Sequence, residues 1–374
     1  MTIRLFVLGL CLAIPLPAWA ETHVSVALDW MLNTNHIGLV VARDQGLYAA
    51  KGLEVELLPY SDTNSAALLA GGAADFAYMT SLGFMSARAG GADLVALWAT
   101  MQHDPGRLVY NSDNADITRP ADLSGKTYAG FGSAWEGALI GTMIRNDGGE
   151  PVWDTVILGT GAYEALASGA VDFTLEVATW EGVNSTLLGR KQSSFAYSDY
   201  GIPDQQTGYI GMRAETLAQD PDLAGRFMRA TLAGYEWAAD HPDEAAQILI
   251  AAGDFPNPGL VQGSMKAIAE GGYLRDGDTP VGSIDPVRFS AMAKFLFDSG
   301  VLRDVGGNAL DWPGDVSTWF DRAGEGRGRD GRQQRLVPVS NEDLPCFWLN
   351  SLQGGTFRSS YKNHQGPDTT AAMV

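Results

Sequence analysis

The sequence predicts two α/β lobes, and three observations support that prediction. Short runs rich in β-branched residues alternate with segments of helical spacing, which is typical of a parallel sheet covered by helices. The 374 residues exceed the usual size of one compact domain. Two polar, turn-rich segments, residues 113–120 and 200–207, interrupt the alternation and are expected to be the crossovers between lobes.

The first lobe is expected to open with a strand at residues 24–28. A helix at 36–50 follows, because Ile37, Val40, Val41 and Leu47 share one side at helical spacing. Ser81 stands where an N-cap would, ahead of the last helix of this run. The other elements expected before the first crossover are strands at 53–58, 74–79 and 94–100 and helices at 65–69 and 82–89.

The second α/β unit follows the first polar segment. Its expected strands are 127–129, 155–158 and 171–177, and its expected helices are 134–145, 162–167 and 180–188. From Gly208 the chain returns as a strand and then as four helices that begin at or just after a proline, a residue favoured in the first helical turn. These helices are expected at residues 221–240, 242–252, 258–270 and 286–299.

This order predicts a discontinuous first lobe, residues 21–111 plus 209–323, and an inserted second lobe, residues 112–208. Two adjacent crossovers make a hinge, and the cleft between two hinged lobes is a favoured place for a small ligand.

Residues 1–20 have the pattern of a secretory signal peptide. Arg4 precedes an apolar run, and Ala18 and Ala20 form a small-x-small cleavage site. The run is too short for a membrane span, which disfavours an uncleaved anchor. Leu10 disfavours a lipoprotein attached through Cys11. We therefore expect export to the periplasm and cleavage after Ala20, which leaves one cysteine and no intrachain disulfide.

The net charge of −19 argues against nucleic acid as a partner, because such a surface repels phosphate. The acidic character ends at the segment 324–374, which contains an arginine-rich stretch and lacks helical or strand periodicity. We expect this tail to be disordered. A reading-frame error or a functional basic arm are the alternatives.

Motifs for catalysis and cofactors are incomplete. A phosphate-loop ending at Gly125-Lys126-Thr127 has Pro120 where glycine is needed, and Trp135 occupies the third position of a dinucleotide-type glycine motif. No G-x-S-x-G elbow occurs, and the five histidines never fall at metal-ligand spacing. The sequence therefore predicts a binding protein with no catalytic residue, no cofactor and no metal.

Polar and aromatic residues follow the strand ends, where open α/β sheets bind ligands. The first group is Asp29, Trp30, Asn33 and His36; the alternative is a polar loop in which Asn35 caps the next helix. The other candidate ligand-binding residues are Ser81, Gly132, Ser133, Trp135, Trp180 and Glu181.

Two of these later segments have a specific chemistry. Gly130, Gly132 and Ser133 are expected to leave backbone N–H groups open at a helix start, although Glu136 there is as well explained by the helix dipole. Glu181 beside Trp180 has the pattern of a carboxylate that pairs with the N–H edge of a heterocycle while an aromatic ring stacks on its face; the alternative is an ordinary first helical turn.

These segments together resemble the NMT1/THI5-like group of periplasmic binding proteins, and in particular its thiamine-pyrimidine-binding branch. LDWMLNTNHIG at residues 28–38 is similar to the opening pattern of that branch, apart from Leu32 in place of the usual proline. The further landmarks are ARDQGLYAAKGLEVEL, ALLAGGAADFAYM, ADLSGKTYAG and ATWEGVN, in the same order.

The resemblance implies a type II periplasmic binding protein that closes over an aminopyrimidine, such as a formylaminopyrimidine, and docks as a monomer on an ABC permease. It implies that Trp30 stacks on the ligand and that Asn33 and His36 line the first lobe. Glu181 would pair with the aminopyrimidine edge, and Ser133 would contact the ligand from the second lobe.

The same group includes enzymes that build this pyrimidine from their own histidine in a single turnover. The resemblance places Met79 and Gly83 where such an enzyme needs its lysine and histidine, and the stretch that should be cysteine-rich, residues 204–211, has no cysteine. A binder of sulfonates or of a riboflavin-like ring is the other alternative, and a sulfonate site should rely on backbone amides and basic groups.

Overall fold

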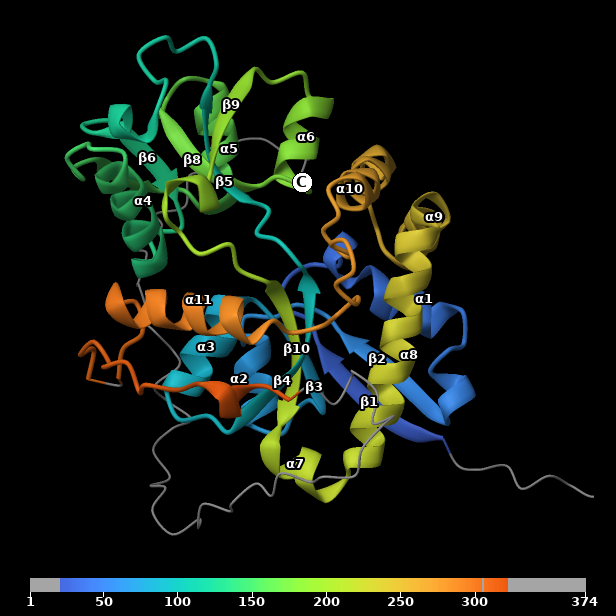
Figure 1. Cartoon of the computed structure of the whole chain (residues 1–374). Helices are drawn as coiled ribbons and strands as arrows, with labels where there is room; N and C mark the ends of the chain where they lie inside the picture. Colours follow the sequence, from blue (N-terminus) through green and yellow to red (C-terminus); the bar gives the residue numbers. More distant parts are fainter. Residues whose placement is uncertain (1–20, 305, 322–374) are drawn as a thin grey trace, which may run out of the picture.

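The computed structural model describes residues 21–304 and 306–321. The predicted signal peptide, residues 1–20, and the predicted tail, residues 324–374, lie outside the described residues. The described chain forms two five-stranded sheets, each covered by helices, with one sheet above the other in Figure 1. We call the parts built on these sheets lobe 1 and lobe 2.

The sheet of lobe 1 has the strand order β2-β1-β3-β10-β4. β1, β2 and β3 are parallel, whereas β10 runs antiparallel to both β3 and β4. The prediction of a parallel sheet is therefore wrong at β10, the strand that brings the chain back from lobe 2. The strands are β1 Thr22–Ala27, β2 Leu53–Leu58, β3 Phe76–Met79, β4 Leu94–Met101 and β10 Thr207–Arg213.

The sheet of lobe 2 has the order β7-β6-β8-β5-β9, with β5 antiparallel to its neighbours β8 and β9. Both sheets thus contain one reversed strand, and in each it is the first strand after a crossover. The strands are β5 Gly106–Asn111, β6 Thr127–Gly130, β7 Asp154–Ile157, β8 Phe173–Val177 and β9 Gln192–Ala196.

The first crossover lies earlier than the sequence indicates. β5 pairs with β8 and β9 of lobe 2, so the chain changes lobes at residues 102–105, between β4 and β5, and not in the polar segment 113–120. Asn111, expected as the last residue of the first lobe, ends a strand of the second sheet. The second crossover, between β9 and β10, occupies residues 197–206 and includes most of the predicted segment 200–207.

The helices of lobe 1 cover both faces of its sheet. α1, α8, α9 and α10 pack with one set of strand side chains, and α2, α3 and α11 pack with the alternate set. This two-sided cover explains why every residue of β4 is buried. The helices are α1 Ile37–Asp44, α2 Ser65–Ala70, α3 Ser81–Ala89, α7 Ala214–Gln219, α8 Pro221–Asp240, α9 Pro242–Ala252, α10 Pro258–Glu270 and α11 Pro286–Asp298.

Lobe 2 has the same layered plan on a smaller scale. α4 packs on one face of the sheet and α5 on the other. The helices are α4 Ala134–Asn146, α5 Ala162–Ala167 and α6 Glu181–Leu187. Among residues 21–304 and 306–321, no helix has both the length and the apolar character that crossing a bilayer requires.

Helix starts agree with the sequence where proline or a short polar side chain marks them. α8, α9, α10 and α11 each begin with proline, as predicted. Two predicted N-caps are wrong by one or two residues. Thr80, not Ser81, caps α3 by accepting the N–H of Gly83, and Asn33, not Asn35, caps the 3-10 turn that precedes α1.

Helices α1 and α8 approach closely at two glycines. A Cβ on Gly234 would lie 2.2 Å from the Gly38 carbonyl oxygen, so alanine there has to push the two helices apart. We expect Gly234→Ala to lower the free energy of unfolding by about 1–3 kcal/mol, measured by urea unfolding. Gly137→Ala in α4 is the matched control, because a Cβ there meets nothing within 4 Å. It should be neutral or stabilising by about 0.5–1 kcal/mol, and equal losses at both glycines would contradict the close approach.

Candidate ligand site between the two lobes

The topology brings the carboxyl ends of the parallel strands of both lobes to the crossovers. In lobe 1, Thr207 at the start of β10 pairs with Met101 at the end of β4, so both crossovers attach at that edge of the sheet. In lobe 2, Gly106 at the start of β5 pairs with Val177 at the end of β8, which places the same ends at the hinge. The segments that follow these strands therefore face the other lobe, where open α/β sheets bind ligands.

Asp29 is held in place by a fully buried histidine. His36 has no exposed surface, and its Nδ1 accepts the backbone N–H of Asn33 at 3.3 Å. Its Nε2, 3.0 Å from Asp29 Oδ1, must therefore carry the hydrogen that Asp29 accepts. The Tyr78 ring meets the imidazole edge-on, with the ring centroids 4.7 Å apart. His36 thus orients a carboxylate at the end of β1, and any effect on a ligand runs through Asp29.

Asn33 is engaged with its own loop. Its side chain accepts the N–H of Asn35 at 2.8 Å and donates to the carbonyl oxygen of Met31 at 3.0 Å. The side chain of Thr34 meets Ser264 of α10 at 2.6 Å between hydroxyl oxygens. These hydrogen bonds make the predicted loop a rigid element fixed to α10. Trp30 is the aromatic residue of this loop.

Trp30 has an aromatic neighbour that the sequence analysis missed. The ring of Tyr60, which follows β2, lies 4.9 Å from the Trp30 ring between centroids, at an interplanar angle of 51°. Tyr60 is 44% exposed, so this pair presents aromatic surface at the carboxyl ends of two adjacent strands. The rule used for Trp30, that ligand groups follow strand ends, would also have found Tyr60.

The side chain of Ser81 hydrogen-bonds to a residue of the hinge and does not cap α3. Its hydroxyl donates to Oε1 of Gln205 in the second crossover, and Nε2 of Gln205 donates to Asp104 in the first crossover at 2.7 Å. Burial raises the pKa of Asp104 to about 6. This chain of hydrogen bonds joins both crossovers to the end of β3.

In the glycine turn after β6, the backbone N–H groups already have a hydrogen-bond acceptor. The backbone N–H groups of Phe131, Gly132 and Ser133 donate to the Glu136 carboxylate at 3.0, 2.6 and 3.0 Å. Ser133 is the N-cap of α4, and Glu136 completes its capping box. The prediction that the N–H groups of Gly132 and Ser133 are open is therefore wrong, because a side chain of the same turn accepts their hydrogen bonds.

The two candidate tryptophans of lobe 2 pack across the lobe boundary. The Trp135 ring meets Phe295 of α11 edge-on at 6.0 Å between centroids, and Trp180 packs against the lobe 1 core. α6 also contacts α10, where Val183 lies close to Gly263. Figure 1 shows the same arrangement, with α4 next to α11 and α6 next to α10. Both tryptophans therefore lie between the lobes.

Glu181 is the first residue of α6 and lies in a desolvated environment between the lobes. Its Oε2 accepts the N–H of Val177 at 3.1 Å, and its side chain keeps partial exposure. Burial raises its pKa to about 7, against the lowering effect of its backbone hydrogen bonds. A carboxylate that is this poorly solvated and has few partners is typical of a binding position.

Two more lobe 2 residues belong to this region and were missed from sequence. Glu176 in β8 has no exposed side-chain surface, pairs with Arg107 of β5 at 2.7 Å from Nε, and keeps one oxygen without a partner. Burial, followed by the charges of Glu181, Glu176 and Glu136, raises the pKa of Tyr163. Tyr163 lies in the first turn of α5, after β7, so the strand-end rule could have found it.

The raised pKa of Glu181 predicts how its glutamine variant changes stability. The folded state disfavours the ionised form of Glu181, so ionisation lowers the free energy of unfolding. This loss is absent below the ordinary pKa of 4.5 and grows as the pH rises towards about 7. We expect ligand-free Glu181→Gln to be more stable than wild type by about 1–3 kcal/mol at pH 8, after allowance for partial exposure, and equal to it at pH 4.5. Urea unfolding at both pH values tests this; a difference independent of pH would contradict it.

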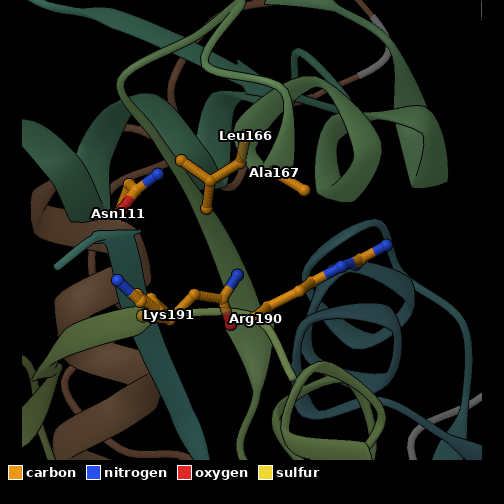
Figure 2. A pocket seen from close by; sticks show the side chains of 6 residues that line it. Asn111, Leu166, Ala167, Arg190 and Lys191 are labelled. Carbon is orange, nitrogen blue, oxygen red and sulfur yellow. The ribbon is translucent and has the colours of Figure 1, made fainter. Parts of the chain in front are cut away.

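Neither a metal cluster nor the pocket drawn in Figure 2 offers an alternative site for a heterocycle in the part of the chain that the structure describes. Among residues 21–304 and 306–321, no group of three or more His, Cys, Asp and Glu side chains is arranged to hold a metal ion. Figure 2 shows a pocket of about 50 Å³ lined by residues such as Asn111 and Arg190. Asn111 pairs with Gln192 at the end of the lobe 2 sheet remote from the hinge, and this volume holds water molecules and not a heterocycle.

Two known proteins, one named for binding and one named as a synthase, are similar in sequence to this chain. The chain is 28% identical over 246 residues, 64% of this chain and 73% of its relative, to the formylaminopyrimidine-binding protein of Halalkalibacterium halodurans. It is 21% identical over 244 residues, 61% of this chain and 73% of that protein, to the 4-amino-5-hydroxymethyl-2-methylpyrimidine phosphate synthase of Legionella pneumophila.

A solved structure supports the fold. The periplasmic aliphatic sulphonate binding protein SsuA of Escherichia coli superposes with a TM-score of 0.61 at 15% identity, over 86% of this chain and 98% of that one. The chain thus has the two-lobed fold of type II periplasmic binding proteins, as the sequence predicts. The family model described as NMT1/THI5 like matches residues 33–245, and the chain belongs to that family.

Proposed function

We propose that this protein is the solute-binding component of an ABC importer that captures a thiamine-precursor aminopyrimidine without turnover. Glu181 is the observation that carries the proposal. Glu181 is a carboxylate between the two lobes, and burial raises its pKa to about 7. It therefore suits a ligand that donates N–H hydrogen bonds to it. The relative named for binding formylaminopyrimidine supports the choice of ligand class.

The proposed ligand pose uses both lobes. The exocyclic amine of the pyrimidine donates to Glu181, and the ring stacks on Trp30 beside Tyr60. Asp29, oriented by His36, accepts a second N–H or a hydroxyl from the lobe 1 side. Asn33, Ser81, Trp135 and Trp180 complete the proposed contacts. A planar ring held by stacking on one lobe and by a charge-assisted hydrogen bond on the other favours closure of the two lobes.

The location and partners follow from the same proposal. Residues 1–20 direct export and are removed, the mature chain acts in the periplasm as a monomer, and its closed form docks on an ABC permease.

Calorimetric titration of the mature protein with 4-amino-5-hydroxymethyl-2-methylpyrimidine and its formylamino analogue tests the proposal. We expect saturable binding and a rise in Tm that grows with ligand concentration. Thiamine, riboflavin and taurine are the comparison ligands. Tighter binding of taurine than of either pyrimidine would contradict the proposed ligand class.

One comparison favours a second candidate, because the Legionella relative is named as a synthase. The positions at issue in this chain are Met79, at the buried end of β3, and Gly83 in α3. Incubation with pyridoxal phosphate and iron, followed by mass spectrometry of the intact chain, separates the two functions. Binding without turnover predicts an unchanged mass, whereas loss of mass from a histidine together with release of pyrimidine would support the synthase.

A further inference from the structure

The turn after β6 has the geometry of an anion-binding site that is already filled. Gly132 has a positive φ of 75°, which turns the N–H groups of Phe131, Gly132 and Ser133 towards one point at the start of α4. Convergent N–H groups at a helix N-terminus generally bind phosphate, sulfate or carboxylate. Here the occupant is the Glu136 carboxylate of the same chain.

Glu136 does more than an ordinary capping box requires. A capping-box glutamate accepts the N–H of the cap residue, which here is Ser133, but Glu136 also accepts the N–H groups of Phe131 and Gly132. Glu136 is 4% exposed, so an incoming anion would have to displace a buried carboxylate to reach these donors. The donors that could recognise an anion are thus committed within the protein.

The acidic side chains around this turn support the same interpretation. Glu136, Glu176 and Glu181 all lie close enough to Tyr163 to raise the pKa of its phenol, after burial itself. Glu176 has a buried oxygen without a partner, and its other oxygen pairs with Arg107. Like-charge juxtaposition of this kind rejects an anionic ligand.

The geometry points to Glu136 as a specificity residue: it fills the anion site of lobe 2, and the site therefore accepts a neutral or cationic heterocycle and rejects anions, including the phosphate monoester of the same pyrimidine. This inference rests on the proposed function for the identity of the heterocycle. The role of Glu136 in rejecting anions can be tested without knowing which heterocycle binds.

The test compares two ligands and two variants by calorimetry. In wild type, 4-amino-5-hydroxymethyl-2-methylpyrimidine should bind at least about 100-fold more tightly than its phosphate monoester, since the like charges of the site oppose the added anion. Glu136→Ser, which frees the three N–H groups, should reduce this ratio by at least about tenfold. Glu164→Ser is the matched control, because the Glu164 side chain is 78% exposed on α5 and outside the site; it should leave the ratio unchanged.

A second measurement is independent of the pyrimidine. Methyl phosphate should raise the Tm of Glu136→Ser but not of wild type. Should the serine variant fail to fold, Glu136→Gln keeps the shape of the side chain and removes its charge, and should change both readouts in the same direction by a smaller amount.

The outcomes separate the two proposals. Absence of pyrimidine binding to wild type would contradict the proposed function, while the methyl phosphate response of the variants would still decide the role of Glu136. Similar wild-type affinities for the alcohol and its phosphate ester, or Glu136 variants with an unchanged ratio and no methyl phosphate response, would overturn the role of Glu136.

Discussion

Glu181→Gln is expected to weaken binding of 4-amino-5-hydroxymethyl-2-methylpyrimidine at pH 8 by about 1.5–3 kcal/mol, roughly 10–150-fold in Kd. The variant keeps the size of the side chain and an oxygen for the N–H of Val177, but it loses the charge that strengthens a hydrogen bond from the ligand amine. Calorimetric titration of both proteins gives the two dissociation constants directly.

The control for this loss is Glu164→Gln. Glu164 is a lobe 2 glutamate of the same chemistry that lies on the exposed side of α5 and pairs with Arg190. Its variant should bind as wild type does. Equal affinity of wild type and Glu181→Gln would remove Glu181 from the site. Because the same substitution is expected to stabilise the ligand-free protein at pH 8, weaker binding cannot be attributed to partial unfolding.

The second large effect is expected at Trp30. Truncation to alanine removes the stacking surface at the end of β1 and should weaken pyrimidine binding by about 1–3 kcal/mol, the usual contribution of one stacked base. Tyr60 stays in place and limits the loss, because its ring already lies 4.9 Å from the Trp30 ring between centroids.

Trp30→Phe tests whether the ring or the bulk matters. An aromatic ring of similar placement should retain more than half of the binding free energy lost in the alanine variant, and circular dichroism checks that both variants fold. Wild-type affinity of Trp30→Ala would show that the ligand does not use this face of lobe 1.

Local sequence signals predict much of the fold. Proline at the first turn places the starts of α8, α9, α10 and α11, and a glycine ahead of β2 marks its start. β5 and β9 were not predicted, because their place is decided by pairing across lobe 2 and not by their own periodicity. The reversed direction of β5 and β10 was missed for the same reason. The direction of each strand depends on which lobe the chain enters, and a short stretch of sequence does not show this.

The candidate site was predicted in part. The strand-end rule identifies the segments that the topology brings to the hinge, and the same rule extends to Tyr60 and Tyr163. It does not reveal what each side chain does there. His36 is fully buried behind Asp29, and Glu136 accepts the N–H groups of its glycine turn. Both outcomes depend on three-dimensional contacts within a few residues.

A crystal structure of the mature protein grown with 4-amino-5-hydroxymethyl-2-methylpyrimidine tests the central claim most directly. We expect the ring between the lobes, stacked on Trp30, with its exocyclic amine within hydrogen-bonding distance of the Glu181 carboxylate. A pyrimidine bound to one lobe alone, or bound away from both of these side chains, would contradict it.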